Sequence, residues 1–119
     1  MGILLGLVAL IASPVSGDLH ERDWCERLAS KYEAETEVVL WDGTRCDLVT
    51  ADEAIEVDWA RSSKIFEAIG KAQYYAIVLD KRPAVLLLVR DLDAERRYVY
   101  RCQTVCAKLG MRLYVERVE

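Results

Sequence analysis

Residues 37–59, EVVLWDGTRCDLVTADEAIEVDW, contain three short runs rich in apolar and β-branched side chains, at residues 37–41, 45–50 and 54–59. Between the first two runs lies Asp42-Gly43, one of the strongest hairpin signals in protein sequences. A second tight turn at Ala51-Asp52 separates the last two runs. This stretch therefore predicts three antiparallel strands in a meander.

The residues around the meander show helical and strand patterns. Apolar residues at helical spacing predict helices over residues 19–32, 62–79 and 91–109, the first capped by Asp18 and the last closed by Gly110. The continuous apolar run 84–89 predicts a strand buried on both faces, and residues 111–118 supply a last strand. The order αβββαβαβ predicts an α/β fold with a mixed central sheet flanked by helices.

The first seventeen residues, MGILLGLVALIASPVSG, carry no charged side chain and include the apolar run 3–12. A run of this length followed by small residues is typical of a signal peptide, and it is shorter than the roughly 20 residues that span a bilayer. We expect a signal peptide at residues 1–17 and one domain at residues 18–119. The protein would then be periplasmic or secreted, with no stable membrane association after cleavage.

The chain has a net charge of −4 and four cysteines: Cys25, Cys46, Cys102 and Cys106. The negative charge argues against a broad basic surface, so any contact with nucleic acid has to rely on a local groove or on metal ions. In an exported protein, four cysteines permit two disulfides in three possible pairings. The alternative is four buried thiols.

Three carboxylates converge on the meander if its second hairpin turns about Ala51-Asp52. This register places Asp47 directly opposite Glu56, and Asp58 follows two residues later on the same face. Like charges opposed on a sheet are unfavourable, and burial raises their cost. Because carboxylate oxygens suit Mg²⁺, we predict that these three residues bind Mg²⁺, with Mn²⁺ as the alternative.

The same register can be continued through the first hairpin. It predicts Val38 beside Asp47, and Leu40 beside Arg45. The alternative to a metal site is an ordinary solvated acidic face that Arg45 helps to neutralise, since one sequence does not fix a register.

Lys64, Glu67 and Lys71 recur at i, i+3 and i+7 on the predicted helix that follows the meander. A lysine on this helix face could reach the acidic cluster. The alternative is a solvated helix face with ion pairs within the helix.

Residues 42–76, DGTRCDLVTADEAIEVDWARSSKIFEAIGKAQYYA, resemble the PD-(D/E)XK, or restriction-endonuclease-like, nuclease superfamily. The resemblance is strongest to small bacterial and phage proteins with the pattern DGTRxDxLT, AIEVDFA and KWxEAIGQxxYYA, and it covers about a third of the chain. It implies a restriction-endonuclease-like αβββαβ core. By this resemblance, Asp47 and Glu56 match the two metal ligands of the motif, and Glu26 matches an acidic residue that some members carry in the first helix.

The chain departs from the family pattern at two positions. Asp58 stands where the motif has its lysine, and Lys71 stands where relatives have glutamine. Some members carry the lysine on the following helix instead, and Lys64 matches that position. Lys71 is a second candidate cation, and Gln73 could take over the polar contact of the missing glutamine.

The resemblance implies a Mg²⁺-dependent nuclease that hydrolyses the phosphodiester bonds of DNA, with RNA left open as substrate. Asp47 and Glu56 would bind the metal, helped by Asp58, and Lys64 or Lys71 would act in catalysis. A homodimer is compatible with this role because many small nucleases need two sites to cut a duplex. The alternative is an exported nuclease-fold domain that has lost catalysis and acts as a binding or structural module.

Overall fold

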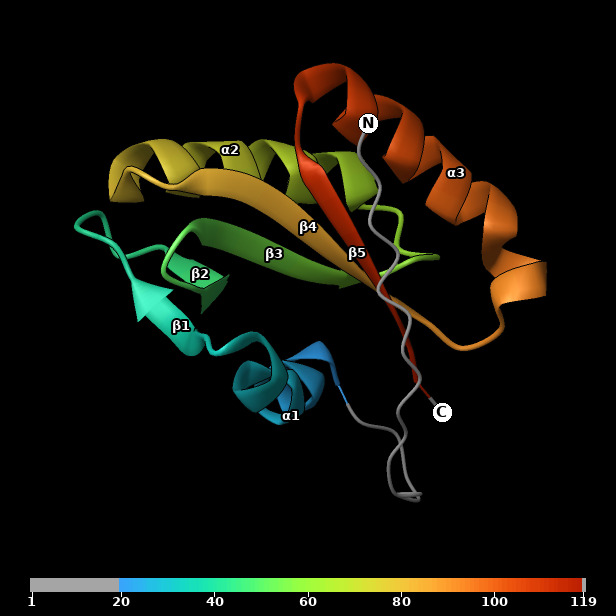
Figure 1. The fold of residues 1–119 in the computed structure, drawn as a ribbon, viewed down its shortest axis with the longest axis horizontal. Coiled ribbons are helices and arrows are strands. Elements are labelled where there is room, and N and C mark those ends of the chain that lie inside the picture. The colour runs from blue at the N-terminus through green and yellow to red at the C-terminus, as the bar shows by residue number, and fades with distance from the viewer. Residues whose placement is uncertain (1–19, 119) are drawn as a thin grey trace.

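The computed structural model describes residues 20–118, so the predicted signal peptide at residues 1–17 lies outside the described residues. In residues 20–118 the chain forms three helices and five strands, in the predicted order (Figure 1). They are α1 (Glu21–Tyr32), β1 (Glu35–Val39), β2 (Arg45–Val49), β3 (Glu53–Trp59), α2 (Ile65–Leu79), β4 (Arg82–Val89), α3 (Leu92–Leu109) and β5 (Arg112–Arg117). None of these helices is long and apolar enough to cross a membrane.

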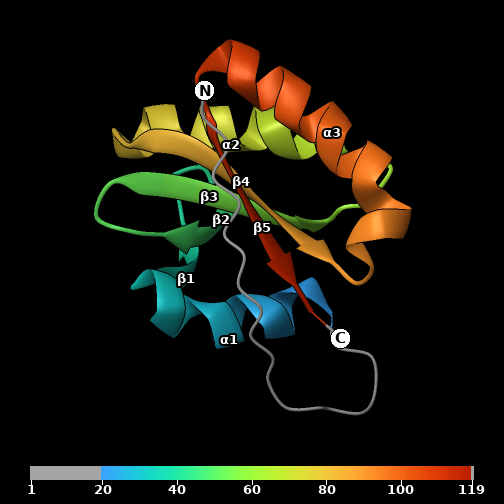
Figure 2. The ribbon, with the colours of Figure 1, turned by 45° about the vertical axis from the view of Figure 1, so that its right-hand side comes forward.

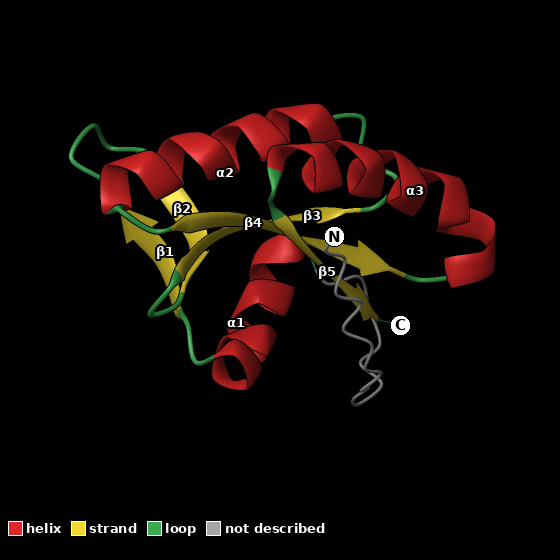
Figure 3. Ribbon diagram, turned by 45° about the horizontal axis from the view of Figure 1, so that its top comes forward, coloured by secondary structure: helices red, strands yellow, loops and turns green. Residues whose placement is uncertain are grey.

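The five strands form one mixed sheet in the order β1-β2-β3-β4-β5. The first three strands are the predicted antiparallel meander, and β4 and β5 continue the sheet in parallel with β3. Helices α2 and α3 cover one face of the sheet and α1 covers the other (Figures 2 and 3). The prediction of an α/β fold with a mixed central sheet flanked by helices is therefore confirmed.

Strand β4 forms the centre of the core, and its residues 84–89 are fully buried. Val85, Leu87 and Val89 pack with residues of α2 and α3, whereas Leu86 and Leu88 pack with residues of α1. Because side chains alternate along a strand, a strand covered on both faces needs a continuous apolar run. The sequence of residues 84–89 supplies this run.

Two helices begin later than the sequence predicts. Helix α1 begins at Glu21, after His20, whose backbone N–H donates to Asp23 Oδ2 at 3.0 Å, and the predicted cap Asp18 lies outside the described residues. Helix α2 begins at Ile65 because the preceding residues form a turn, in which the Lys64 N–H donates to Ser62 Oγ at 3.0 Å.

The register predicted for the first hairpin is wrong by one residue. Val38 pairs with Cys46 and Val39 with Arg45, so Val38 does not lie beside Asp47. The loop has three residues instead of two, because Leu40 N–H donates to the carbonyl of Thr44 at 2.8 Å. Gly43, the last loop residue, has a φ of 89°, and a left-handed glycine at this position is typical of three-residue hairpin loops.

The four cysteines are all free thiols and all buried. The closest pair is Cys102 and Cys106, one turn apart on α3, with their sulfur atoms 3.9 Å apart. A disulfide needs a sulfur separation of about 2.05 Å. The structure thus contains four buried thiols instead of the two predicted disulfides.

Candidate functional site

The candidate site forms where strands β2 and β3 separate. The two strands pair at Val49 with Ala54 and at Leu48 with Ile55, which is the predicted register. The next pair would be Asp47 with Glu56, but at this position side-chain carboxylates accept the hydrogen bonds of the backbone N–H groups. Asp47 Oδ2 accepts a hydrogen bond from the Val57 N–H at 2.9 Å, and Glu56 Oε2 accepts one from the Asp47 N–H at 3.3 Å.

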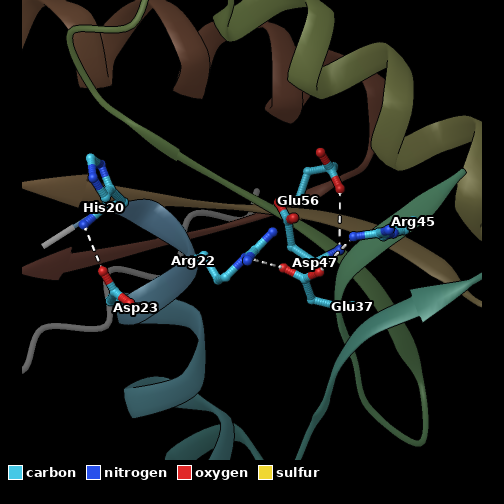
Figure 4. A network of polar contacts seen from close by, with 7 residues as sticks. All are labelled: His20, Arg22, Asp23, Glu37, Arg45, Asp47 and Glu56. Carbon is cyan, nitrogen blue, oxygen red and sulfur yellow. Dashed lines mark hydrogen bonds and ion pairs between the residues drawn. The ribbon is translucent and has the colours of Figure 1, made fainter.

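Asp47 and Glu56 are therefore neighbours, as the register argument predicts (Figure 4). Asp47 is half-buried and Glu56 is buried. Glu56 is only 6% exposed. Burial, and then the charge of Asp47, raise the pKa of Glu56 to about 9. Burial also raises the pKa of Asp47, although hydrogen bonds from Val57 and from Glu56 oppose the shift. Without a cation, the two carboxyl groups hold a proton between them near neutral pH.

Arg45 does not neutralise this pair. It forms an ion pair with Glu37 at 3.3 Å, and Arg22 of α1 contacts the same carboxylate at 3.1 Å (Figure 4). Glu37 lies within β1 with a φ of 51°, a left-handed conformation that costs a non-glycine residue on the order of 1 kcal/mol. The alternative of a solvated acidic face balanced by Arg45 is wrong, because Glu56 is buried and Arg45 is engaged elsewhere.

A cavity of about 270 Å³ opens beside Glu56. It brings together residues from α1, from β3, from the loop after β3 and from the start of α2: Glu21, Glu56, Val57, Asp58, Ser62, Lys64, Glu67, Ala68 and Lys71. Of the residues predicted from the sequence, Glu56, Asp58, Lys64 and Lys71 line the cavity. Asp47 does not line it, but its N–H donates to Glu56 Oε2. Gln73 does not line the cavity.

The two candidate lysines differ in the carboxyl groups on which their charges act. Lys71 is among the main charges that act on the pKa values of Asp47, Glu56 and Glu21, whereas Lys64 is among those that act on the pKa of Glu21. Lys71 also pairs with Glu67 at 3.6 Å along the helix, and Lys64 is the residue that immediately precedes α2. Lys71 is therefore the lysine whose charge acts on both carboxyl groups of the pair, from the wall of the same cavity.

Glu21, the first residue of α1, is a site residue that the sequence reasoning missed. Burial, followed by the charges of Asp58 and Asp47, raises its pKa to about 7. The resemblance pointed to Glu26 instead, but Glu26 is exposed and does not line the cavity. Helical spacing could have identified Glu21, because it precedes the buried residues Trp24 and Cys25 by three and four positions and so shares their face.

The site fits a magnesium ion held by two protein ligands. Among residues 20–118, no three histidine, cysteine, aspartate or glutamate side chains are arranged to hold a metal ion. Asp58 therefore does not complete a cage with Asp47 and Glu56, and its Oδ1 accepts a bond from the Trp59 N–H at 2.8 Å. Mg²⁺ commonly binds through one or two carboxylates and keeps several waters, so the pair supplies a sufficient donor set.

A second cavity, also of about 270 Å³, lies at the opposite end of the sheet. Its main acid, Glu53, is already balanced by Arg112 at 3.5 Å and by the Tyr114 hydroxyl at 2.7 Å. The cavity beside Glu56 is the stronger candidate because its carboxylate pair has no such compensation.

Comparison of the chain with protein-family models, with curated proteins and with solved structures gives no match. The case for a function therefore rests on the residues and geometry of the cavity, together with the resemblance of residues 42–76.

Proposed function

We propose that the protein is a Mg²⁺-dependent phosphodiesterase with a restriction-endonuclease-like core, and that it hydrolyses DNA. The observation that carries the proposal is the adjacent pair of Asp47 and Glu56, which lies where β2 and β3 separate and on which the charge of Lys71 acts. The order of helices and strands, with this pair on the second and third strands of the meander, supports it. The resemblance of residues 42–76 to the PD-(D/E)XK superfamily supports phosphodiester hydrolysis as the reaction.

Each residue of the site would have its own role in phosphodiester hydrolysis. Asp47 and Glu56 would hold the metal, which when bound activates water and stabilises charge on the phosphoryl group. Lys71, whose charge acts on both carboxyl groups, would orient the attacking water or neutralise phosphate oxygens. Lys64, which immediately precedes α2 and also lines the cavity, would contact the phosphate as a second cation.

Glu21 has the pKa that suits proton transfer near neutral pH. At about 7, its pKa lets the carboxylate accept a proton from the attacking water under physiological conditions. Glu21 lines the same cavity as Lys64 and Lys71.

A second candidate function is a nuclease-fold module without catalysis. The observation that favours it is Asp58, which occupies the position of the family lysine and adds a negative charge to the cavity. This module would bind a cation at the same pair without cutting nucleic acid.

Cleavage of supercoiled plasmid and of single-stranded DNA and RNA, with Mg²⁺, with Mn²⁺ or with EDTA, tests the proposal. We expect metal-dependent cleavage that is lost in Asp47→Asn and Glu56→Gln and retained in Asp52→Asn, whose exposed carboxylate lies at the other end of β3. Lys71→Ala should lower the rate about 100-fold or more. A protein that cuts none of these substrates with either metal would overturn the nuclease and leave the binding module.

A further inference from the structure

Three arginines converge on one aromatic ring beside the candidate site. The guanidinium carbons of Arg61, Arg97 and Arg101 lie 5.4, 5.3 and 5.5 Å from the centre of the Tyr98 ring. Arg61 belongs to the loop after β3, and the other three residues lie on the middle turns of α3. We call these four residues the arginine cluster.

The positive charge of the arginine cluster is mostly uncompensated. Arg61 has a partner in Glu95, with an N–O distance of 3.8 Å. Within residues 20–118, neither Arg97 nor Arg101 forms an ion pair with a carboxylate, and both side chains are exposed. A cation stacked on a tyrosine face at an exposed site gains only about 0.5–1 kcal/mol. The guanidinium groups of the cluster therefore still repel one another, and a bound anion would reduce this repulsion.

The cluster is continuous with the candidate site. Arg61 is followed at once by Ser62 and then by Lys64, both of which line the cavity. Asp58, on the cavity wall, precedes Arg61 by three residues, so at most about 11 Å of chain separates them. A polymer held in the cavity thus meets the arginine cluster within a short distance of its reacting bond.

We propose that the arginine cluster binds the phosphate backbone of the nucleic acid whose phosphodiester occupies the cavity. This inference rests on the proposed function. It adds a surface that binds the part of the nucleic acid outside the cavity, which is not cut. Guanidinium groups match phosphate oxygens in a two-pronged geometry, and arginine is the preferred residue for such contacts. Tyr100, which is 64% exposed and adjacent to Arg101, offers a ring on which an unpaired base can stack.

The arginine cluster also reconciles nucleic-acid binding with an acidic chain. The net charge of −4 excludes a broad basic surface, but electrostatic attraction needs only a local concentration of positive charge next to the site. Each phosphate contact made by such a residue releases counterions, so the affinity must fall as salt rises.

Fluorescence anisotropy of labelled 30-nucleotide DNA, single-stranded and duplex, tests the surface in EDTA, where cleavage is stopped. We expect Arg97→Ala/Arg101→Ala to weaken binding at least 10-fold and to lower the slope of log affinity against log salt by about 2. The matched control is Arg82→Ala, which removes an exposed arginine at the far end of β4. Thermal unfolding shows whether each variant is folded. Arg97→Lys/Arg101→Lys should keep the salt slope of the wild type and lose part of the affinity, because lysine keeps the charge and lacks the two-pronged geometry.

The outcomes separate the surface from the catalytic proposal. Wild-type binding that falls in the double alanine variant, in a protein that cuts nothing, would support the surface and refute the nuclease. Equal affinity and equal salt slope in the wild type and the double alanine variant would overturn the surface, whether or not the protein cuts DNA. Binding of phosphatidylserine vesicles in place of DNA, with the same dependence on Arg97 and Arg101, would overturn it in favour of a membrane surface.

Discussion

Asp47 and Glu56 substitute for the backbone ladder at the point where their strands part. The carboxylate of Asp47 accepts the N–H of Val57, and the carboxylate of Glu56 accepts the N–H of Asp47. Each acid is thus fixed by a backbone donor while the separation of β2 and β3 opens space beside it. The result is a pair of adjacent carboxyl groups, one buried and one half-buried, and the charge of Lys71 acts on both. Several measurable consequences follow from the cost of burying this pair.

Metal binding at the pair should release a proton. Glu56 has a pKa of about 9, so below this pH a metal ion must displace the proton from the pair before it binds. We expect Mg²⁺ to bind about 100-fold more tightly at pH 8.5 than at pH 6.5, tenfold for each pH unit. Isothermal titration calorimetry in buffers of different ionisation enthalpy measures both the affinity and the protons released. An affinity independent of pH would show that the ion binds elsewhere.

Glu56→Gln should remove a pH dependence of stability in EDTA. In the wild type, the pKa of Glu56 rises on folding from its ordinary value of 4.5 to about 9, so the folded state holds the proton more tightly. Its contribution to stability is complete below pH 4.5 and is lost as the pH rises through 9. Glutamine resembles the protonated acid, so the variant should unfold at a higher temperature than the wild type at pH 9. The difference should shrink towards pH 5.

The exposed cavity residue Glu67 supplies the control for this experiment. Glu67→Gln removes a carboxylate from the same cavity without removing a buried charge. Its unfolding temperature should follow the wild type across the pH range. A Glu56→Gln profile parallel to that of the wild type would mean that Glu56 is ionised in the folded protein without metal.

Much of this fold can be predicted from short-range patterns, because each element carries its own signal. The run at residues 84–89 specifies a doubly buried strand, and the close turn at Ala51-Asp52 fixes the register of β2 and β3. The first hairpin shows the limit. Asp42-Gly43 indicates a turn but not its length. The loop also includes Trp41, and this additional residue shifts every pair of β1 by one position.

The candidate site was predictable only in part, for a physical reason. Asp47 and Glu56 are related by the register of one hairpin, which is a local property. Helical spacing places Glu21 on the buried face of α1, but the part of the sheet that this face meets depends on packing between distant segments, which no spacing in the sequence specifies. The choice between Lys64 and Lys71 depends likewise on how α2 lies over β3.

Glu21 should titrate near neutral pH, and Asp58 should contribute to this. Burial is the main cause of its raised pKa, and the charge of Asp58 is the next. Asp58→Asn removes that charge, so we expect the pKa of Glu21 to fall below 7 while the carboxyl group stays buried. Carbon-detected NMR titration of the glutamate carboxyl groups reports the shift. Asp52→Asn, far from α1, is the control. If the pKa of Glu21 is unchanged in Asp58→Asn, Glu21 does not lie close to Asp58.

The thiols should be unreactive in the folded protein. Burial raises the pKa of Cys46 to about 12 and also raises that of Cys25, so neither forms the thiolate that attacks a disulfide reagent. We expect little reaction with Ellman's reagent in buffer and four thiols per chain in denaturant. Dithiothreitol should leave the unfolding temperature unchanged. Fewer than four thiols in protein purified without reductant would reveal a disulfide and contradict the structure.

Glu116 on β5 offers a test of how the α1 face is held together. Its side chain is 1% exposed, and its Oε2 accepts bonds from Lys31 Nζ at 2.6 Å and from the Tyr32 hydroxyl. Among the described residues, its Oε1 has no hydrogen-bond partner. Lys31→Met would leave a buried carboxylate without a counter-charge, and we expect this to lower the free energy of unfolding by about 2–3 kcal/mol, since Lys31 is itself partly exposed.

The second substitution separates charge from packing. In the Lys31→Met background, Glu116→Gln should restore stability, because it removes the uncompensated charge and keeps an acceptor for Tyr32. In the wild type the same substitution should destabilise, since it breaks the ion pair. Urea unfolding of the four proteins at pH 7 gives the coupling energy, with Lys108→Met on α3 as the control for loss of an exposed lysine. If Lys31→Met costs no more than Lys108→Met, the contact between Lys31 and Glu116 does not stabilise the fold.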